Sequence, residues 1–504
     1  MNATGALTLR VEGSLVHLGY YTASVALGTP ARAFSLVVDT GSTMTILPRE
    51  ACEGSRSSRA VKRRDPGCTA AGADGSGDGV CRFRIAYLEG SSYRGTVAED
   101  VAYFTSVGGG GEDATAAAAV VRFGCATHEE GKVRAQLADG VLGLGRGPTR
   151  LGLVDQLSRS GAVERAEFSL CLPSLVEHAG PAAAGGGAGI LIVGPAADMH
   201  RPPDVRYTPL LSGPGLDPAL YHVHLDAIEF IVPGTDGDGS ADGVGAAVRI
   251  GIAGTGGAGD RPAAARAVVD SGSSYSYLPT GAFWASVDAI VNVHCIEGVN
   301  ARADGLRCRP IDGPDDAYRD FCFVIEAGDG GAAAHDVDAI FPRMRMVFGG
   351  AAGAGDGSAR VEGVATNYLF RHSTRRNAWC LGIFERAPAP GRAEDALIGG
   401  IFLRNTLVHF DEAASRIGFL HANCTAFAGA VREGRAAVHE GAQPRPPQWS
   451  SGFAVAALVC LVAATLAVAW ARFHRARLMD FGLRSTLAAR RRGWRKVSAA
   501  SSPS

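Results

Sequence analysis

The sequence VVDTGST at 37–43 returns as VVDSGSS at 268–274, and this repeated acid loop is the feature that most constrains the fold. Each copy is followed by an apolar-apolar-Gly element, GVLGLG at 140–145 and ALIGGIF at 396–402. An internal repeat of this size predicts two similar lobes with a site between them. The chain of 504 residues is also too long for one ordinary core, which favours the same division.

Short β-branched or alternating segments, separated by Gly, Pro and Asp turns, predict a mostly β fold. They lie at 20–27, 34–39, 80–87, 95–104, 120–124, 189–194, 221–232, 268–270, 343–348, 380–384 and 407–410. Helical periodicity is limited to 153–160, 281–293 and a segment from Asn405 onward. That is too little helix for an α/β sheet with crossovers.

Asp39 and Asp270 each stand at the end of an apolar strand, where a tight turn begins. The turn can direct the carboxylate away from the apolar side chains of the strand. Glycines in the turn allow close backbone approach, and hydroxyls can hydrogen-bond the acids. These residues are Gly41, Ser42, Gly272 and Ser273. If the loops face each other, the pair retains one proton, because two adjacent like charges cannot both ionise. One carboxyl then acts as general base on a water while the other polarises a scissile carbonyl.

Together with IAYLEGSSYRG at 85–95 and LIGGIFLRNTLVHFDEAASRIGF at 397–419, these motifs resemble the pepsin-like (A1) aspartic proteases over nearly all of 15–425. The resemblance implies an aspartic endopeptidase with a bilobal fold and an active-site cleft between the lobes. It implies that Tyr87 is the flap tyrosine that closes over substrate, and that the hydroxyls of Thr40 and Ser271 tie the acid loops together. Ile46 stands where the pepsin pattern has a Trp that partners this tyrosine, so the flap's hydrogen bonding is expected to differ.

Four further runs are more specific: Tyr-x-Glu-Gly-Ser at 87–91, FGCATHEE at 123–130, VVDSGSSYSYLP, and NYLF before WCLGIF. They resemble the membrane-tethered plasmepsin V type of apicomplexan parasites, which cut exported proteins after an Arg-x-Leu motif. This resemblance implies that Glu89 selects the substrate Arg; a solvated hairpin Glu is the alternative reading. Leu88 departs from that group, which carries a flap cysteine there. The run GLGRGPTRLGLVDQL at 143–157 looks instead like the plant nepenthesin type, which implies broader specificity.

The apolar run FAVAALVCLVAATLAVAW at 453–470 predicts a transmembrane helix. The segment from Arg472 onward holds nine Lys or Arg and one acid, which places it in the cytosol and the body in the lumen or outside the cell. The rest of the chain keeps 40 of the 49 basic and 49 of the 50 acidic residues, so nucleic acid is not an expected partner. The expected parts are an N-terminal lobe at 1–205, a C-terminal lobe at 206–425, a linker at 426–451, a transmembrane helix at 452–471 and a basic tail at 472–504.

Ten of the eleven Cys lie outside the span, an even number suited to disulfides in an oxidising lumen. Cys380 and Cys424 flank the last strands and are the expected disulfide. No C-x-x-C pair or second zincin His occurs, so we expect neither a metal nor a cofactor. The sequons at Asn2 and Asn423 fit N-glycosylation. A lumenal body also needs a signal peptide, and no apolar core for one precedes Leu15.

The predicted function is that of a monomeric, single-pass type I endopeptidase that processes protein or peptide substrates of the secretory pathway. The alternatives are a cell-surface sheddase, a broader nepenthesin-like protease and a catalytically silent binding scaffold. The run Lys62-Arg63-Arg64 is interpreted as a solvated loop, with a processing site as the alternative.

Overall fold

The chain divides into two compact units, residues 1–438 and 439–504. The computed structural model describes only residues of the first unit. The described residues are 6–15, 18–65, 68, 79–87, 90–106, 116–146, 151–174, 188–195, 204–231, 247–254, 263–264, 266–290, 307–312, 321–326, 337–349, 359–372, 378–386 and 396–433.

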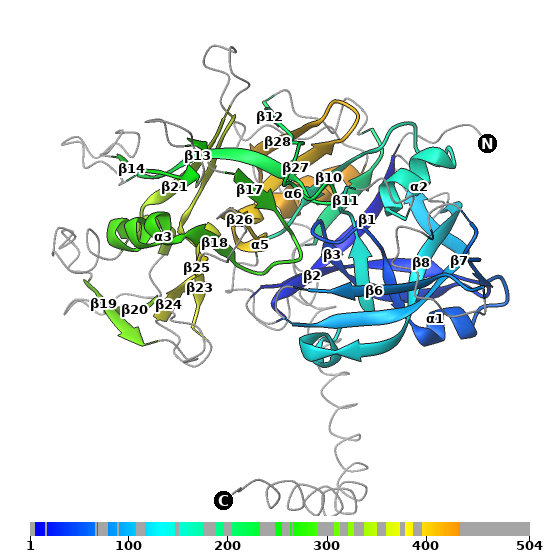
Figure 1. Ribbon diagram of the computed structural model, residues 1–504. Coiled ribbons are helices and arrows are strands. Elements are labelled where there is room, and N and C mark those ends of the chain that lie inside the picture. The colour runs from blue at the N-terminus through cyan, green and yellow to red at the C-terminus, as the bar shows by residue number, and fades with distance from the viewer. Residues whose placement is uncertain are drawn as a thin grey trace, which may run out of the picture. The chain divides into compact units, whose positions relative to one another are not determined.

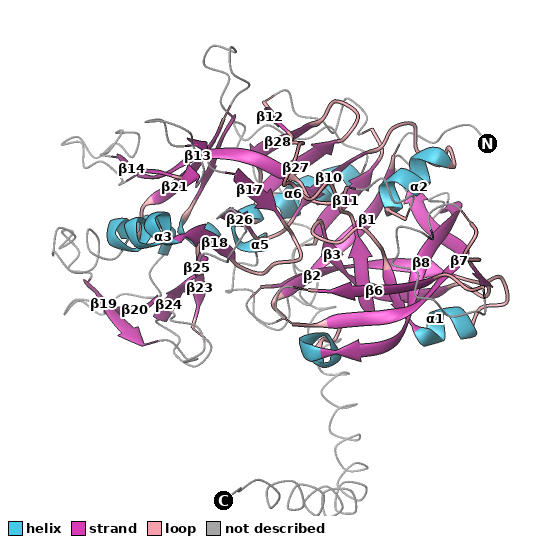
Figure 2. Ribbon diagram, in the orientation of Figure 1, coloured by secondary structure: helices cyan, strands magenta, loops and turns pink. Residues whose placement is uncertain are grey.

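Strands make up most of the described N-terminal half (Figure 1, Figure 2). They are β1 Leu7–Ser14, β2 Tyr20–Leu27, β3 Arg32–Asp39, β4 Ile46–Pro48, β5 Arg59–Ala60, β6 Arg82–Ala86, β7 Ser92–Ser106, β8 Ala116–Glu130, β9 Gly140–Gly143, β10 Glu167–Cys171 and β11 Gly189–Val193. The helices of this half are α1 Arg49–Glu53 and α2 Leu153–Arg159, with a 3₁₀ turn at Gly131–Ala135.

The C-terminal half is also mainly strands. They are β12 Arg206–Pro209, β13 His222–Ile231, β14 Ala247–Gly251, β15 Ala253–Gly254, β16 Ala263–Ala264, β17 Arg266–Val269, β18 Ser276–Pro279, β19 Arg307–Asp312, β20 Phe321–Glu326, β21 Arg343–Phe348, β22 Ala359–Gly363, β23 Leu369–Arg371, β24 Ala378–Leu381, β25 Ile383–Arg386, β26 Ala396–Ile398, β27 Thr406–Asp411 and β28 Arg416–His421. The helices are α3 Thr280–Val287, α4 Val337–Ile340, α5 Gly400–Leu403 and α6 Cys424–Arg432, with a 3₁₀ turn at Ala365–Asn367.

One 14-stranded sheet joins the two halves. Its order is β12-β28-β27-β10-β11-β1-β2-β3-β9-β4-β8-β7-β5, with β6 paired to β7. Three of these strands, β12, β27 and β28, come from the C-terminal half, and Phe168 of β10 stacks on Phe410 of β27 with ring centroids 4.4 Å apart. An eight-stranded sheet and a four-stranded sheet complete the C-terminal half, together with a two-stranded ribbon. The halves therefore share a buried core across a continuous sheet.

The two copies of the sequence repeat have the same arrangement of paired strands. In the first half β3 runs parallel to β9, β9 is antiparallel to β4, and β4 is parallel to β8. In the second half β17 runs parallel to β26, β26 is antiparallel to β18, and β18 is parallel to β25. Each acid strand is therefore flanked by its own apolar-apolar-Gly strand in the same arrangement.

The disulfide predicted between Cys380 and Cys424 is wrong. Cys380 lies directly opposite Cys322 in the register of β20 and β24 and bonds to it instead. Cys424 begins α6, which packs with Ile190 of β11, and it bonds to Cys171 of the neighbouring strand. The disulfides among described residues are Cys52–Cys125, Cys68–Cys81, Cys171–Cys424 and Cys322–Cys380.

The end of the body differs from the expected pattern in two places. The segment from Asn405 onward is not helical, because β27 pairs on both sides, with β10 and β28. Residues 426–432 of the predicted linker belong to α6, where Phe427 and Val431 are buried and Asn423 caps the helix by accepting from Ala426 N at 3.0 Å. None of the described helices is long and apolar enough to cross a membrane. The span predicted at 452–471 lies outside the described residues.

Candidate active site

Asp39 and Asp270 each stand at the end of a strand that a parallel neighbour holds in place. Asp39 ends β3, and its carbonyl accepts a hydrogen bond from Leu144 N at 2.8 Å. Asp270 follows β17, and its N–H donates to Ile398 O at 3.0 Å. Leu144 and Ile398 belong to the two apolar-apolar-Gly elements. Each element therefore fixes the backbone of one acid.

The two acid loops face each other in close contact. A Cβ on Gly41 would lie 2.7 Å from Asp270 Oδ1, and a Cβ on Gly272 would overlap the Asp39 carboxyl. The approach is reciprocal, so each loop needs glycine where the other loop's carboxyl meets it. The structure thus brings Asp39, Gly41, Asp270 and Gly272 into one site.

Each carboxylate is held by its own loop. Gly41 N donates to Asp39 Oδ1 at 2.8 Å, and Ser42 Oγ donates to Asp39 Oδ2. The second loop repeats both bonds: Gly272 N donates to Asp270 Oδ1 at 2.9 Å, and Ser273 Oγ donates to Asp270 Oδ2 at 2.7 Å. These bonds orient the carboxyls and leave their other lone pairs available.

Thr40 and Ser271 cross-link the loops with a symmetric set of hydrogen bonds. Thr40 Oγ1 donates to Val269 O at 3.1 Å and accepts from Ser271 N at 2.9 Å. Ser271 Oγ donates to Val38 O at 2.8 Å and accepts from Thr40 N at 3.1 Å. Both side chains are buried. The spacing of the two acids therefore depends on two hydroxyls, one from each half.

The environment of Asp39 favours its neutral form. Asp39 is only 7% exposed to solvent. Burial, and after it the negative charge of Asp270, raise the pKa of Asp39 from 3.8 to about 7, although hydrogen bonds from Ser42 and Gly41 act in the opposite direction. A carboxyl with such a pKa holds its proton in mildly acidic solution, which is what shared-proton chemistry requires.

Tyr87 follows β6 and reaches the first acid loop. Its hydroxyl lies 3.3 Å from Ser42 Oγ, and its ring meets Tyr93 edge-on with centroids 6.2 Å apart. Ile46 is fully buried in the apolar cluster beneath Tyr87 and has no polar side-chain group to offer it. Tyr87 thus contacts the serine that also binds Asp39. Glu89 lies outside the described residues.

Tyr221 supports the site and was not identified from the sequence. It is fully buried, and its hydroxyl lies 2.8 Å from both Leu144 O and Glu412 Oε1. Its carbonyl accepts from Val269 N at 3.0 Å, one residue before Asp270. Tyr221 therefore links Leu144, whose N–H binds the Asp39 carbonyl, to the strand that carries Asp270. A tyrosine beside an apolar strand gives no sign of such a role in the sequence.

Two groups of potential metal ligands occur among the described residues. They are Cys322, His372 and Cys380, and Glu167, His409 and Asp411. In the first group both Cys are disulfide-bonded, so they offer no thiolate. In the second, the two carboxylates already pair with Arg165 at 3.0 Å and Arg416 at 2.9 Å. Neither group includes a residue of the acid loops, whose own chemistry is that of two carboxyls.

Two family models match the two halves of the chain. Residues 21–192 match the model described as xylanase inhibitor N-terminal, and residues 249–421 match the one described as xylanase inhibitor C-terminal. Together they cover more than half of the chain and include both acid loops.

Several curated relatives are aspartic proteinases, and solved structures share the fold of this chain. The chain is 23% identical to aspartic proteinase 36 of Arabidopsis thaliana over 84% of this chain and 78% of that one. It is 24% identical to aspartic proteinase nepenthesin-2 of Nepenthes gracilis over 58% and 61% of the two chains. The crystal structure of soybean basic 7S globulin shares the fold, with a TM-score of 0.59, 17% identity, and coverage of 84% and 99%. These plant relatives give the plasmepsin V resemblance no support. The chain belongs to the pepsin-like aspartic protease family and is an aspartic-type endopeptidase.

Proposed function

We propose that Asp39 and Asp270 share one proton and activate a water molecule that attacks the scissile carbonyl of a bound peptide. Asp39, whose pKa is raised, holds the proton and polarises the carbonyl, while the other carboxylate accepts a proton from the water. The roles reverse as the amine leaves. The observation that carries the proposal is the reciprocal approach of each carboxyl to the glycine of the opposite loop.

Substitution of either acid tests this mechanism. Asp39→Asn and Asp270→Asn should each lower kcat for peptide cleavage by about 10³-fold, since each removes one partner of a general acid–base pair. Asp217→Asn makes the same chemical change at an exposed position and is the matched control. Full activity in either acid variant would refute the shared-proton mechanism.

The enzyme acts on secretory or exported proteins from the lumenal or extracellular side of a membrane. The disulfides of the described body support an oxidising compartment, and the apolar run at 453–470 with its Arg-rich flank supports one span and a cytosolic tail. The full chain should therefore stay in the membrane pellet under alkaline carbonate, whereas a chain ending at 451 should be released. Release of the full chain would overturn the anchor. Surface biotinylation distinguishes a processing protease of internal membranes from a cell-surface sheddase.

Cleavage after Arg-x-Leu is the narrower proposal, and it rests on Glu89 and the sequence runs around the flap. A carboxylate pairs well with a guanidinium, so Arg-x-Leu peptides should be cleaved at least tenfold faster than Lys-x-Leu or Ala-x-Leu peptides. Glu89→Gln should remove the difference. Equal cleavage of the three peptides would contradict this proposal and favour the broader specificity of a nepenthesin-like protease, the type to which two relatives of this chain belong.

A catalytically silent binding scaffold is a second candidate, favoured by the description of the two matching family models as xylanase inhibitor domains. It predicts tight binding of a protein partner, unchanged in Asp39→Asn, with no peptide cleavage by the wild-type chain. Cleavage that depends on Asp39 would exclude it.

A further inference from the structure

The peptide group between Leu144 and Gly145 is held from both sides. Its carbonyl oxygen accepts a hydrogen bond from the Tyr221 hydroxyl at 2.8 Å. Its N–H donates to Ser42 O at 2.8 Å, and the hydroxyl of the same serine donates to Asp39 Oδ2. A hydrogen bond to the carbonyl of a peptide group strengthens the bond that its N–H makes. The Tyr221 hydroxyl therefore acts on the backbone that supports the first acid loop.

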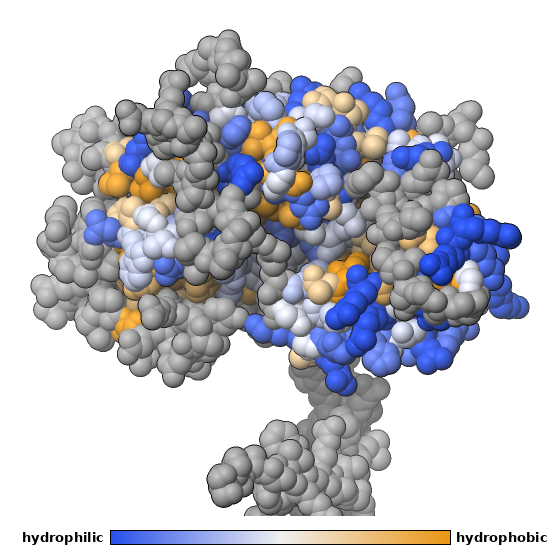
Figure 3. Space-filling view, in the orientation of Figure 1, coloured by the Kyte–Doolittle hydropathy of each residue, from blue (hydrophilic) through white to orange (hydrophobic). Residues whose placement is uncertain are grey.

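The backbone of Tyr221 is bound at the same time to the strand of the second acid. Its carbonyl accepts from Val269 N at 3.0 Å, directly before Asp270. Its ring is fully buried and meets Phe410 edge-on, with centroids 4.6 Å apart. Hydrophilic residues gather over the N-terminal half on the face drawn in Figure 3, but Tyr221 contributes none of that surface. Its protein neighbours therefore decide which hydrogen bonds the hydroxyl makes.

The hydroxyl of Tyr221 has one proton and two close acceptors. Glu412 Oε1 lies 2.8 Å from it, the same distance as Leu144 O. Leu144 O is a carbonyl oxygen and can only accept, so its contact requires the phenol proton. Burial, and after it the charge of Glu412, raise the pKa of Tyr221 well above its usual range, so the phenol keeps that proton. The contact with Glu412 then needs a second proton, which a neutral carboxyl supplies by donating to the phenol oxygen.

The surroundings of Glu412 favour the neutral carboxyl that this proton count requires. Glu412 follows β27, and its carbonyl accepts from Ser415 N at 3.2 Å in the turn to β28. Burial is the largest influence on the pKa of Glu412 and raises it above its usual range. The hydrogen bond from Tyr221 and the charge of Arg146 act in the opposite direction, and the charge of Asp155 adds to the rise. The net result favours the protonated form.

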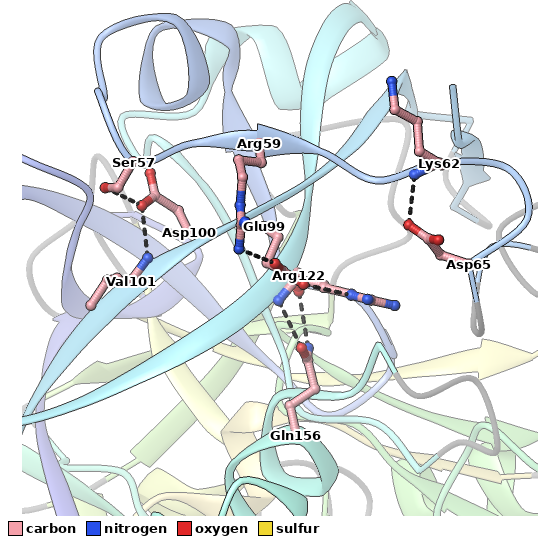
Figure 4. Close-up of polar contacts among 9 residues, drawn as sticks. All are labelled: Ser57, Arg59, Lys62, Asp65, Glu99, Asp100, Val101, Arg122 and Gln156. Carbon is pink, nitrogen blue, oxygen red and sulfur yellow. Dashed lines mark hydrogen bonds and ion pairs between the residues drawn. The ribbon is translucent and has the colours of Figure 1, made fainter. Parts of the chain in front are cut away.

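The charge of Asp155 comes from a helix that is attached to the sheet. Asp155 lies on α2, where Arg159 donates to both of its carboxylate oxygens at 2.8 Å. The next residue, Gln156, bonds both backbone groups of Arg122 in β8 through its side-chain amide (Figure 4). Arg122 is itself paired with Glu99 at 3.1 Å. The negative group that opposes ionisation of the carboxyl beside Tyr221 is therefore held in place by the first half of the chain.

Ionisation of Glu412 redirects the phenol proton. A hydrogen bond to a carboxylate is roughly twice as strong as one to a neutral carbonyl. The proton of Tyr221 therefore turns toward an ionised Glu412, and Leu144 O loses its donor. The peptide group that binds the backbone of Ser42 is then held from one side only. The protonation state of Glu412 is in this way connected to the support of the first acid loop.

We propose that Glu412 is a positioning residue, whose neutral carboxyl keeps the Tyr221 proton on Leu144 O and so holds the first acid loop in the geometry that cleavage requires. The inference rests on the proposed peptide-cleaving function and adds to it a residue outside the acid loops. Because the pKa of Glu412 is raised in the folded chain, the arrangement is complete below about pH 4.5 and is lost as pH rises through the raised value. Loss of one typical hydrogen bond corresponds to about a fivefold change in rate.

The test compares kcat for peptide cleavage from pH 4 to pH 8 in the wild type and in Glu412→Gln. Glutamine stays neutral, and its NH₂ group donates to the phenol oxygen at every pH. The ratio of kcat in the variant to kcat in the wild type should therefore rise about fivefold over this range, because ionisation of the acid pair affects both enzymes and cancels. In a Tyr221→Phe background, Glu412→Gln should leave the ratio independent of pH.

Glu164→Gln makes the same chemical change at an exposed position and is the matched control, with a ratio that does not vary with pH. A constant ratio for Glu412→Gln, or a rise that persists in the Tyr221→Phe background, would overturn the proposal. Thermal melts test the Glu412 proton without cleavage, including the case in which Tyr221→Phe does not fold. The wild type should lose melting temperature relative to Glu412→Gln as pH rises, and a difference that is constant with pH would also overturn the proposal. Absence of cleavage by the wild type at every pH would instead count against the proposed function, so the two failures are distinguishable.

Discussion

Replacing Ser271 by alanine should weaken the link between the two acid loops. The Ser271 hydroxyl donates to Val38 O at 2.8 Å and accepts from Thr40 N at 3.1 Å, and the residue is 2% exposed. Alanine deletes both bonds and leaves a buried carbonyl and a buried N–H without these partners. Each loss costs about 1–3 kcal/mol, so the free energy of unfolding should fall by about 2–6 kcal/mol. That is a large share of the stability of an ordinary domain.

The matched control is Ser271→Thr, which keeps the hydroxyl and adds a methyl group. Urea unfolding followed by two independent probes should show a lower midpoint for the alanine variant than for the threonine variant. Since the same bonds set the spacing of Asp39 and Asp270, kcat for peptide cleavage should fall in the alanine variant and be largely retained with threonine. An alanine variant as stable and as active as the threonine variant would refute the reasoning.

Other perturbations probe the acid, the disulfide framework and the tight turn behind Asp270. Because the pKa of Asp39 is raised to about 7, its ionisation in the folded protein lowers stability as pH rises from about 4 through about 7. Cleavage should therefore decline above about pH 7, and thermal melts should show that Asp39→Asn loses less stability over this range than the wild type does; equal losses would contradict the assignment. Cys424→Ser opens the bond to Cys171, which spans 253 residues, and calorimetry should show a loss of about 5 kcal/mol; a loss below about 1 kcal/mol would contradict it. Gly399→Ala drives a methyl group into backbone atoms and should lower the melting temperature, whereas Gly281→Ala, in open space within α3, should leave it unchanged or raise it.

The acid loops could be predicted from the sequence because the information is local. The strand, the acid, the glycine and the hydroxyl lie within seven consecutive residues, and the same order occurs twice. The pairing of β3 with β9 and of β17 with β26 explains why an apolar-apolar-Gly element accompanies each copy. The raised pKa of Asp39 comes from its burial and from the charge of Asp270 in the other half, and neither cause is visible within a single motif.

The disulfides and the shared sheet could not be predicted in the same way. Cys322 and Cys380 are partners because β20 and β24 are neighbours in one register, and Cys171 meets Cys424 because α6 packs on β11. These neighbours are set by the order of strands in space, which alternating hydrophobicity leaves open. The role of Tyr221 has the same origin, since its hydroxyl meets a carbonyl 77 positions away.

The pairing of β10 with β27 also means that β10 is synthesised long before its partner strand. Ser169 and His409 face each other across these strands, yet they are 240 positions apart in the chain. A ribosome adding about 5–20 residues per second needs roughly 10–50 s to cover that interval. During this interval, the edge of β10 that will pair with β27 has unpaired N–H and C=O groups, which can pair with strands of other chains. The half that carries Asp39 is completed only when the last strands of the body emerge, so factors that shield this edge during translation should govern the yield of folded enzyme.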